Sequence, residues 1–336
     1  MKRPKRSRRR ETLPRRRFLR LAAGAAALPA VSRIARAQTY PSRPVRVIVP
    51  FAPAGTTDIL ARLIGQWLSE QLGQSFIVEN RPGASTMIGT EAVVRAPADG
   101  YSLILAATAS AINTTLYEKK ISYDFLRDIA PVAGILRVPN VVVVHPSLPV
   151  RTIPELIAYA KANPGRINVE SPGAGTSSHL AGELFKVMTG VDMVHVQYRG
   201  NGPALIDLLA GQVQVGFDTM PASIEYVRAG KLHALAVSTV TRSQTLPDLP
   251  TVSEFVPGYE SSGYFGLGAP GKTPAEIIDK LNREVNAGLA DPKLRAQLTD
   301  LGGMILAGSP ADFRKLIDDE TEKWGKVIRA ANIKPD

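Results

Sequence analysis

The sequence contains no cysteine among its 336 residues. Disulfide bonds, thiolate metal sites, cysteine nucleophiles and a lipidated N-terminus are therefore excluded. Histidine is also scarce, and the four histidines, at 145, 179, 195 and 233, are never four residues apart and have no acidic cluster beside them. That spacing is not typical of a metal site, so we expect no bound metal and no cofactor.

Long apolar runs are absent after the first 37 residues, since none reaches the roughly 20 residues that a membrane-spanning helix needs. The same part of the chain also lacks an excess of basic residues. The first 37 residues hold 13 of the 41 lysines and arginines and one of the 30 acidic residues, which leaves 28 basic and 29 acidic residues beyond them. A nearly balanced charge gives no basic patch for nucleic acid, so we exclude a nucleic-acid partner.

The first 37 residues have the pattern of a twin-arginine export signal. The motif Pro14-Arg15-Arg16-Arg17-Phe18-Leu19-Arg20 precedes an apolar stretch over 21–31 that is too short to act as a membrane anchor. Ala35-Arg36-Ala37 then offers a signal peptidase an A-x-A site. A disordered basic arm that binds nucleic acid would need neither feature. We therefore predict cleavage near Ala37 and a mature protein that works in the periplasm.

Strand-like and helix-like segments alternate from Val45 onward, which predicts an α/β fold with parallel-rich sheets flanked by helices. Apolar or β-branched runs predict strands at 45–49, 76–78, 101–106, 141–144, 213–217, 233–237 and 264–267. Apolar residues at helical spacing predict helices at 59–72, 88–95, 153–162, 180–188, 275–289 and 313–328. Because no glycine- or serine-rich linker divides the chain, two α/β domains joined by several crossing strands fit the pattern best.

Three predicted strand-to-helix turns share one design, with glycine, serine or threonine just ahead of a helix. They lie at 49–58, 171–179 and 197–203. The first backbone N–H groups of a helix have no partner within it, and glycine lets a ligand approach closely, so each turn is a candidate anion site. Ordinary helix caps share this composition. However, these three turns follow predicted parallel strands, at the sheet edge where open α/β sheets bind ligands.

Three charged residues near these turns each have a structural and a functional interpretation. Asp58 either complements the helix dipole, which we favour, or meets an ammonium group of a ligand. Arg199 is either a solvated loop residue or a partner for a carboxylate. Asp218 ends a predicted strand and either orients a ligand or caps a neighbouring turn.

One segment matches the phosphate loop of ATPases, G-x-x-x-x-G-K-[ST], over residues 266–273. Pro270 removes a backbone N–H from the loop that should surround the phosphate. Thr273 and Glu276 have the spacing of a capping box, with Pro274 next to the threonine, which predicts a helix start. We therefore interpret the segment as structural and expect no nucleotide there.

Ser178 and His179 stand next to each other, as a serine hydrolase might use them. Neighbours on a helix point about 100° apart and cannot form a nucleophile–base pair, and no G-x-S-x-G elbow is present. We therefore interpret His179 as a hydrogen-bonding residue of a loop or first helical turn and predict no catalytic residues.

The chain resembles the Bug-type periplasmic solute receptors of the tripartite tricarboxylate transporter system, over its whole length after the first 37 residues. The matching segments are Val49-Pro50-Phe51 through Asp58-Ile59-Leu60-Ala61-Arg62, Val78-Glu79-Asn80-Arg81-Pro82-Gly83-Ala84, Asp99-Gly100-Tyr101, Gly173 to Leu180, Tyr198-Arg199-Gly200, residues 269–281 and Ala290-Asp291-Pro292. The chain departs from the family at Ala54, Ser85 and Thr86, where glycine is usual.

The resemblance implies a two-domain binding protein, or Venus flytrap, that closes on an organic acid and delivers it to membrane permease subunits. We expect a first domain over 38–139 and 263–336 and a second over 140–262. The resemblance places ligand contacts in the turns 51–58 and 173–179 and in a third loop at 108–113. Together with the charged residues above, the expected ligand-binding residues are Phe51, Ala54, Gly55, Thr56, Asp58, Thr108, Ser110, Gly173, Gly175, Thr176, Ser177, His179, Tyr198, Arg199 and Asp218.

We expect a monomer without cofactor that does not catalyse a reaction. Two alternatives remain open: an exported hydrolase that uses Ser177 or Ser178 with a distant histidine, and a ligand-sensing partner of a membrane signalling protein. The sequence does not identify the acid, because dicarboxylates, tricarboxylates, acidic amino acids and aromatic acids all offer a carboxylate to the same N–H groups.

Overall fold

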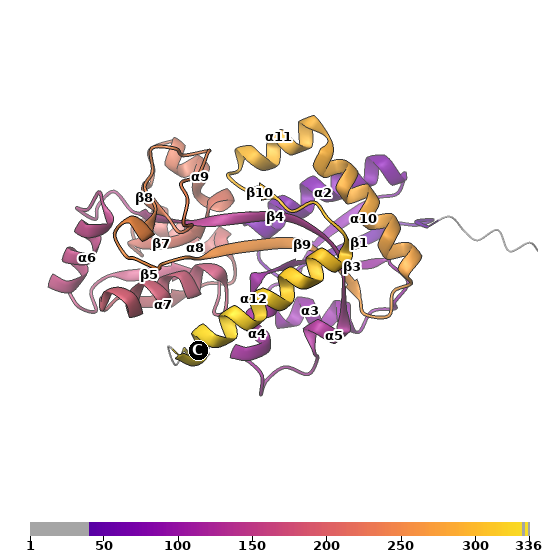
Figure 1. The fold of residues 1–336 in the computed structure, drawn as a ribbon, viewed down its shortest axis with the longest axis horizontal. Helices are drawn as coiled ribbons and strands as arrows, with labels where there is room; N and C mark the ends of the chain where they lie inside the picture. Colours follow the sequence, from indigo (N-terminus) through magenta and orange to yellow (C-terminus); the bar gives the residue numbers. More distant parts are fainter. Residues whose placement is uncertain (1–39, 331–332, 335–336) are drawn as a thin grey trace, which may run out of the picture. The chain divides into compact units, whose positions relative to one another are not determined.

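The computed structural model of the protein describes residues 40–330 and 333–334. The expected twin-arginine motif and cleavage site lie outside the described residues. Within the described part of the chain, no helix is both long and apolar enough to cross a membrane. From Tyr40 onward the chain packs as one unit, in which helices lie against a mixed sheet (Figure 1).

Strands and helices alternate along most of the chain, as the sequence predicts. The strands are β1 (Val45–Val49), β2 (Phe76–Asn80), β3 (Ser102–Ala107), β4 (Ile129–Val144), β5 (Asn168–Ser171), β6 (Val194–Gln197), β7 (Val215–Thr219), β8 (His233–Val237), β9 (Ser262–Pro270) and β10 (Met304–Ile305). The α-helices are α2 (Thr56–Leu72), α3 (Met87–Val94), α4 (Thr108–Leu116), α5 (Phe125–Asp128), α6 (Ile153–Ala162), α7 (Ser177–Thr189), α8 (Asn201–Leu209), α9 (Met220–Arg228), α10 (Ala275–Ala290), α11 (Pro292–Asp300) and α12 (Pro310–Ala330).

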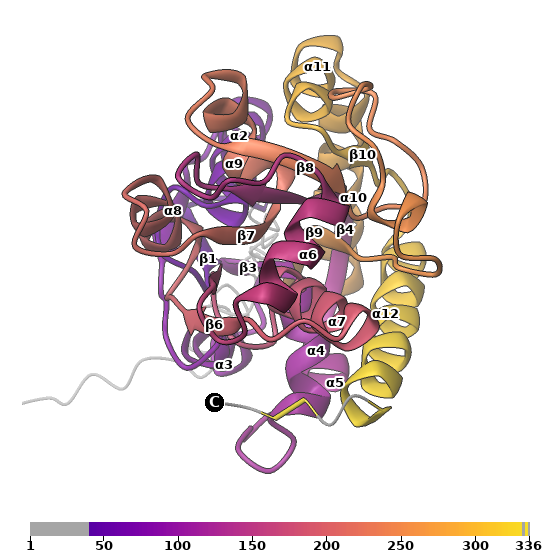
Figure 2. The same cartoon turned by 90° about the vertical axis from the view of Figure 1, so that its left-hand side faces the viewer.

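The strand pairing forms two groups, which we call the first and second lobes. In the first lobe, β2, β1 and β3 run parallel, and β9 lies antiparallel beside β3. In the second lobe, β6, β5 and β7 run parallel. Each lobe has buried apolar clusters of its own. Figure 1 shows α6, α7 and β8 of the second lobe at one end and α2, α10 and α11 of the first lobe toward the other; Figure 2 views the same chain from the α6 end.

The long strand β4 belongs to both lobes. Its residues Ile129–Pro139 pair with β9, and Asn140–Val144 pair with β7 and β8. As expected, the run Val141–Val144 is fully buried. The alternation of segments did not reveal that β4 and β9 run antiparallel to their neighbours. The chain crosses between the lobes along these strands, so no helical crossover sets their direction.

Two local expectations are wrong. For the segment that matches a phosphate loop, the structure adds a further reason for the structural interpretation. The segment 108–113, expected as a loop, forms the first turns of α4. The capping box does not form, because α10 has Pro274 as its N-cap and the buried hydroxyl of Thr273 has no hydrogen-bond partner. The phosphate-loop match lies largely within β9, where Gly266–Pro270 pair with β3 and β4. Backbone N–H groups of a paired strand are not free to surround a phosphate.

Candidate functional site

Five helices begin around one small cavity of about 20 Å³ between the lobes. They are α2 and α4 of the first lobe and α7, α8 and α9 of the second. The residues lining the cavity, which we call the deep cavity, are Phe51, Thr57, Ala107, Thr108, Ala109, Pro172, Thr176, Ser177, Ser178, Asn201, Thr219 and Phe265. The N-terminal N–H groups of a helix and its dipole attract anions, so five such ends make the cavity suitable for a negatively charged group.

Four of these five helices begin without a side-chain cap. Their N-cap residues are Gly55, Ala107, Gly200 and Thr219, and none of these offers a side-chain acceptor to the N–H groups of the first turn. Three of them have no hydroxyl or carboxylate to offer, and the Thr219 hydroxyl bonds instead to that of Thr56, 2.7 Å away. Only α7 is capped, by Thr176. Because first-turn donors normally require an acceptor, these ends are available to a ligand.

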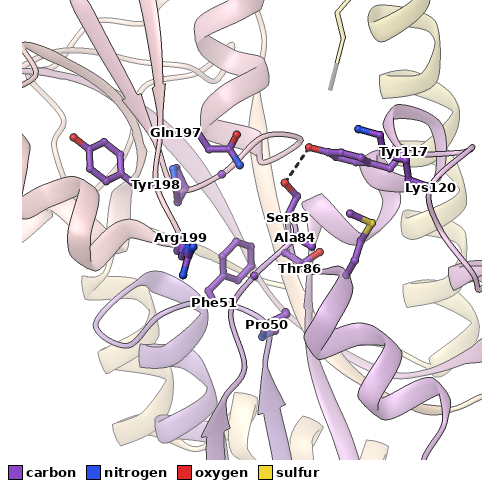
Figure 3. A pocket seen from close by; sticks show the side chains of 14 residues that line it. Pro50, Phe51, Ala84, Ser85, Thr86, Tyr117, Lys120, Gln197, Tyr198 and Arg199 are labelled. Carbon is purple, nitrogen blue, oxygen red and sulfur yellow. Dashed lines mark hydrogen bonds between the residues drawn. The ribbon is translucent and has the colours of Figure 1, made fainter. Parts of the chain in front are cut away.

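A wider cavity of about 350 Å³ lies beside the deep cavity, and Phe51 and Pro172 line both. We call it the outer cavity (Figure 3). It is lined by Pro50, Phe51, Gly83 to Met87, Tyr117, Lys120, Pro172, Gly173 and Gln197 to Arg199. Lys120 and Arg199 are its charged lining residues, and no acidic residue joins them. Figure 3 shows them on opposite walls, with the Phe51 ring between them. The outer cavity therefore combines apolar surface with positive charge.

The lobes touch each other around both cavities. The N–H of Ala52 donates to the Arg199 carbonyl at 3.1 Å. Gly175, at φ +73°, packs so closely against Asn113 that an added Cβ would lie 2.2 Å from its Oδ1. Glycine is therefore required at 175 both for the backbone conformation and for the close approach of the lobes.

Asp58 has a structural role, which agrees with the interpretation favoured from the sequence. Its carboxylate accepts two hydrogen bonds from Arg62, one from Asn80 and one from the N–H of Ala54, a residue at φ +67°. Burial raises the pKa of Asp58, but these hydrogen bonds outweigh it and hold the pKa below its usual value. Neither Asp58 nor Ala54 lines either cavity, so both shape the turn that carries Phe51 and Gly55.

His179 lies in the first turn of α7, as expected, and supports that turn. Its Nδ1 accepts the N–H of Gly175 at 3.1 Å, and its ring stacks on His195 with centroids 4.3 Å apart. Burial, followed by the neighbouring His195 and Lys186, lowers the pKa of His179 to about 3. The ring is therefore neutral, and because its Nδ1 accepts this hydrogen bond, its single proton lies on Nε2. Neither ring nitrogen then has a free lone pair to take a proton from a serine hydroxyl, which does not fit the base of a hydrolase.

The remaining expected residues are divided between the cavities and the interior. Thr108 lines the deep cavity, and its Oγ1 accepts the N–H of Tyr264 at 2.8 Å. Tyr198 lines the outer cavity with its hydroxyl turned away, donating to Asp207 at 2.6 Å. Ser110 is buried with an unpartnered hydroxyl and lines neither cavity. Asp218 is fully buried behind Asn201, which donates to it. The predicted turns therefore contribute residues to the cavities, and the individual ligand contacts stay predictions.

Several lining residues were not predicted individually. Asn201 and Pro172 lie within predicted turns, and Thr219 follows Asp218 at a strand end, so their positions carried a usable signal. Phe265 reaches the cavity from β9, and Lys120 from the segment after α4. Nothing in the local sequence indicated these last two.

Comparisons with known proteins give consistent results. The sequence profile of the tripartite tricarboxylate transporter family receptors matches residues 60–333. Protein BugT of Bordetella pertussis is 37% identical over 300 residues, which cover 89% of this chain and 92% of BugT. The R. palustris protein Rpa4515, solved with adipate, is 41% identical with a TM-score of 0.86, over 88% of this chain and 100% of that chain. MatC from Rhodopseudomonas palustris, solved with bound malate, is 31% identical with a TM-score of 0.82, over 86% and 100%.

Proposed function

The chain belongs to the receptor family of the tripartite tricarboxylate transporters, and on that basis we propose that it captures a small organic acid in the periplasm and delivers it to a membrane transporter. The observation that carries this proposal is the group of four uncapped helix starts around the deep cavity. A carboxylate supplies the acceptors that these N–H groups lack. The ligands of the two similar structures, adipate and malate, are both dicarboxylic acids and support this chemistry.

Binding and closure are one process in this proposal. One carboxylate of the ligand lies at the helix starts of both lobes, and its remaining part extends past Phe51 toward Lys120 and Arg199. The ligand favours the closed arrangement because only that arrangement brings donors from both lobes to it. The lobes move as the two expected domains, over 38–139 with 263–336 and over 140–262. The change of pairing partner at Pro139 and Asn140 of β4 supports a hinge there.

We extend the proposal to export and assembly. The precursor leaves the cytoplasm by the twin-arginine route, is cleaved near Ala37 and acts as a monomer that returns its ligand unchanged. The order of basic, apolar and A-x-A segments in the first 37 residues supports this route. The hydrogen bond from Gly175 to Nδ1 of His179, next to Ser178, occupies the lone pair that a base would use and supports binding without catalysis.

A binding screen of the protein from Gln38 onward tests the function. Adipate, malate and other organic acids are added during thermal melting, with adipamide as an uncharged control of the same length as adipate. A ligand that binds only the folded state raises the free energy of unfolding by about 2.7 kcal/mol when its concentration is a hundredfold above Kd. We expect at least one acid to raise Tm, adipamide to have no effect, and the recovered acid to be unchanged by NMR. Equal shifts with adipate and adipamide, or no shift with any acid, would contradict the proposal.

A further inference from the structure

Two carboxyl groups lie close together inside the second lobe, behind the deep cavity. Glu170 on β5 and Asp218 on the neighbouring strand β7 are both fully buried, and three of their four carboxyl oxygens, Glu170 Oε1 and Oε2 and Asp218 Oδ2, have no hydrogen-bond partner. Gly216 makes room for them, because a Cβ there would lie 2.6 Å from Glu170 Oε1. Ionising both would leave two buried negative charges close together without partners, so at least one of the two carboxyl groups holds a proton.

Polar side chains on the elements around this pair have hydrogen-bond or stacking partners of their own. His195 on β6 bonds to Ser171, His179 on α7 is neutral, and the Tyr198 hydroxyl after β6 donates to Asp207 on α8. The neighbouring strand β4 places the apolar Val141 opposite Asp218. Burial, reinforced for Glu170 by the neighbouring Asp218, raises the pKa of both carboxyl groups.

The pair is connected to the ligand site through one side chain. Asn201, the first residue of α8, lines the deep cavity, and its Nδ2 donates to Asp218 Oδ1 at 3.1 Å. Its Oδ1 therefore faces away from Asp218, toward Gly55 of the first lobe, where an added Cβ would lie 3.1 Å from it. In this orientation the amide presents an acceptor to a cavity that otherwise offers helix N–H donors.

We propose that Glu170 and Asp218 share a proton and orient the Asn201 amide, and that an anionic ligand binds together with one additional proton taken up by this pair. The added proton converts the ionised carboxylate to a second carboxyl, so that Asp218 donates to Asn201 Oδ1. The amide then turns its NH₂ group toward the ligand. A ligand anion close by also raises the affinity of the pair for that proton. The binding part of this inference rests on the proposed function.

The first test needs no ligand. In ¹⁵N-labelled protein, the Asn201 side-chain NH₂ resonance is identified by its loss in Asn201→Ser and followed between pH 4.5 and 8. We expect it to titrate above the usual carboxyl range of about 4, and to lose this step in Glu170→Gln. Asp192→Asn removes an exposed acid of the same lobe and should leave the titration unchanged. A resonance that does not move across the range in the wild type refutes the pair's control of Asn201.

The second test measures the proton itself. Adipate and malate are titrated calorimetrically near pH 7.5 in two buffers of different ionisation enthalpy. We expect uptake of up to one proton per ligand by the wild type and Asp192→Asn, and none by Glu170→Gln. Binding without proton uptake in the wild type overturns the proposal. If neither acid binds, the proposed function fails for these acids, and the amide titration alone decides whether the pair orients Asn201.

Discussion

The contact between Gly175 and Asn113 allows the closing of the lobes to be tested separately from the folding of either lobe. Gly175→Ala adds a methyl group at a left-handed backbone position, 2.2 Å from the Asn113 Oδ1 of the other lobe. The backbone strain is present whether or not the lobes touch. The clash with Asn113 exists only when the lobes touch. Since ligand binding requires the lobes to close, the clash should lower the ligand affinity.

The two costs have different sizes and different readouts. A non-glycine residue in the left-handed region costs roughly 1–2 kcal/mol, which should lower the free energy of unfolding. Asn113 cannot move aside without weakening its two hydrogen bonds, to Ser85 O and Thr86 Oγ1. Each is worth about 0.5–1.5 kcal/mol, so closing should cost about 1–3 kcal/mol more. That corresponds to a roughly 5- to 150-fold loss of ligand affinity.

Two variants separate these effects. Gly190→Ala places the same methyl group at φ +69° at the other end of α7, where no atom lies within 4 Å, so it carries the strain without the clash. Asn113→Ala removes the clashing oxygen and should restore most of the affinity that Gly175→Ala loses. Calorimetric titration of an acid that binds, with melting curves of each variant, measures both quantities. Equal affinity loss in Gly190→Ala, or no recovery in the double variant, would refute the reasoning.

Three further predictions concern the site and the first 37 residues. Ser177→Ala should lower affinity roughly 10- to 100-fold with little loss of stability, because Thr176 and not Ser177 caps α7. Calorimetry and melting curves compare Ser177→Ala with Thr176→Ala, and an unchanged affinity removes Ser177 from the site. Asp58→Asn should lower the free energy of unfolding at pH 7 by about 1–3 kcal/mol, because it weakens the hydrogen bonds of the carboxylate. Because the folded pKa of Asp58 is lowered, its stabilisation is present above the unfolded pKa of about 3.9 and is lost as the pH falls through the folded value, so urea melts of the wild type and variant should converge toward pH 2. Changing Arg15 and Arg16 to Lys should leave the precursor in the cytoplasm, and mature protein in the periplasmic fraction would contradict the twin-arginine route.

The sequence by itself determined most of the local structure and the family. Gly73 ends α2 in the left-handed conformation, as the position of this glycine after the apolar repeat predicts. The family resemblance is confirmed by the profile match over residues 60–333, and with it the α/β binding-protein fold. The turns at 49–58, 171–179 and 197–203 all contribute residues to the two cavities. They could be predicted because helix starts have a characteristic local composition.

Only the tertiary structure decided which side chains meet. The two lobes bring Thr56 to Thr219 and Gly175 to Asn113, and β9 brings Phe265 to the deep cavity, across separations of up to about two hundred residues. The closeness of Glu170 to Asp218 follows from the placing of β5 beside β7. Backbone propensity and apolar periodicity act over a few residues, so they fix helices, strands and caps. Strand order, register and the closeness of the lobes depend instead on which surfaces bury each other, and that is settled only when the whole chain has packed.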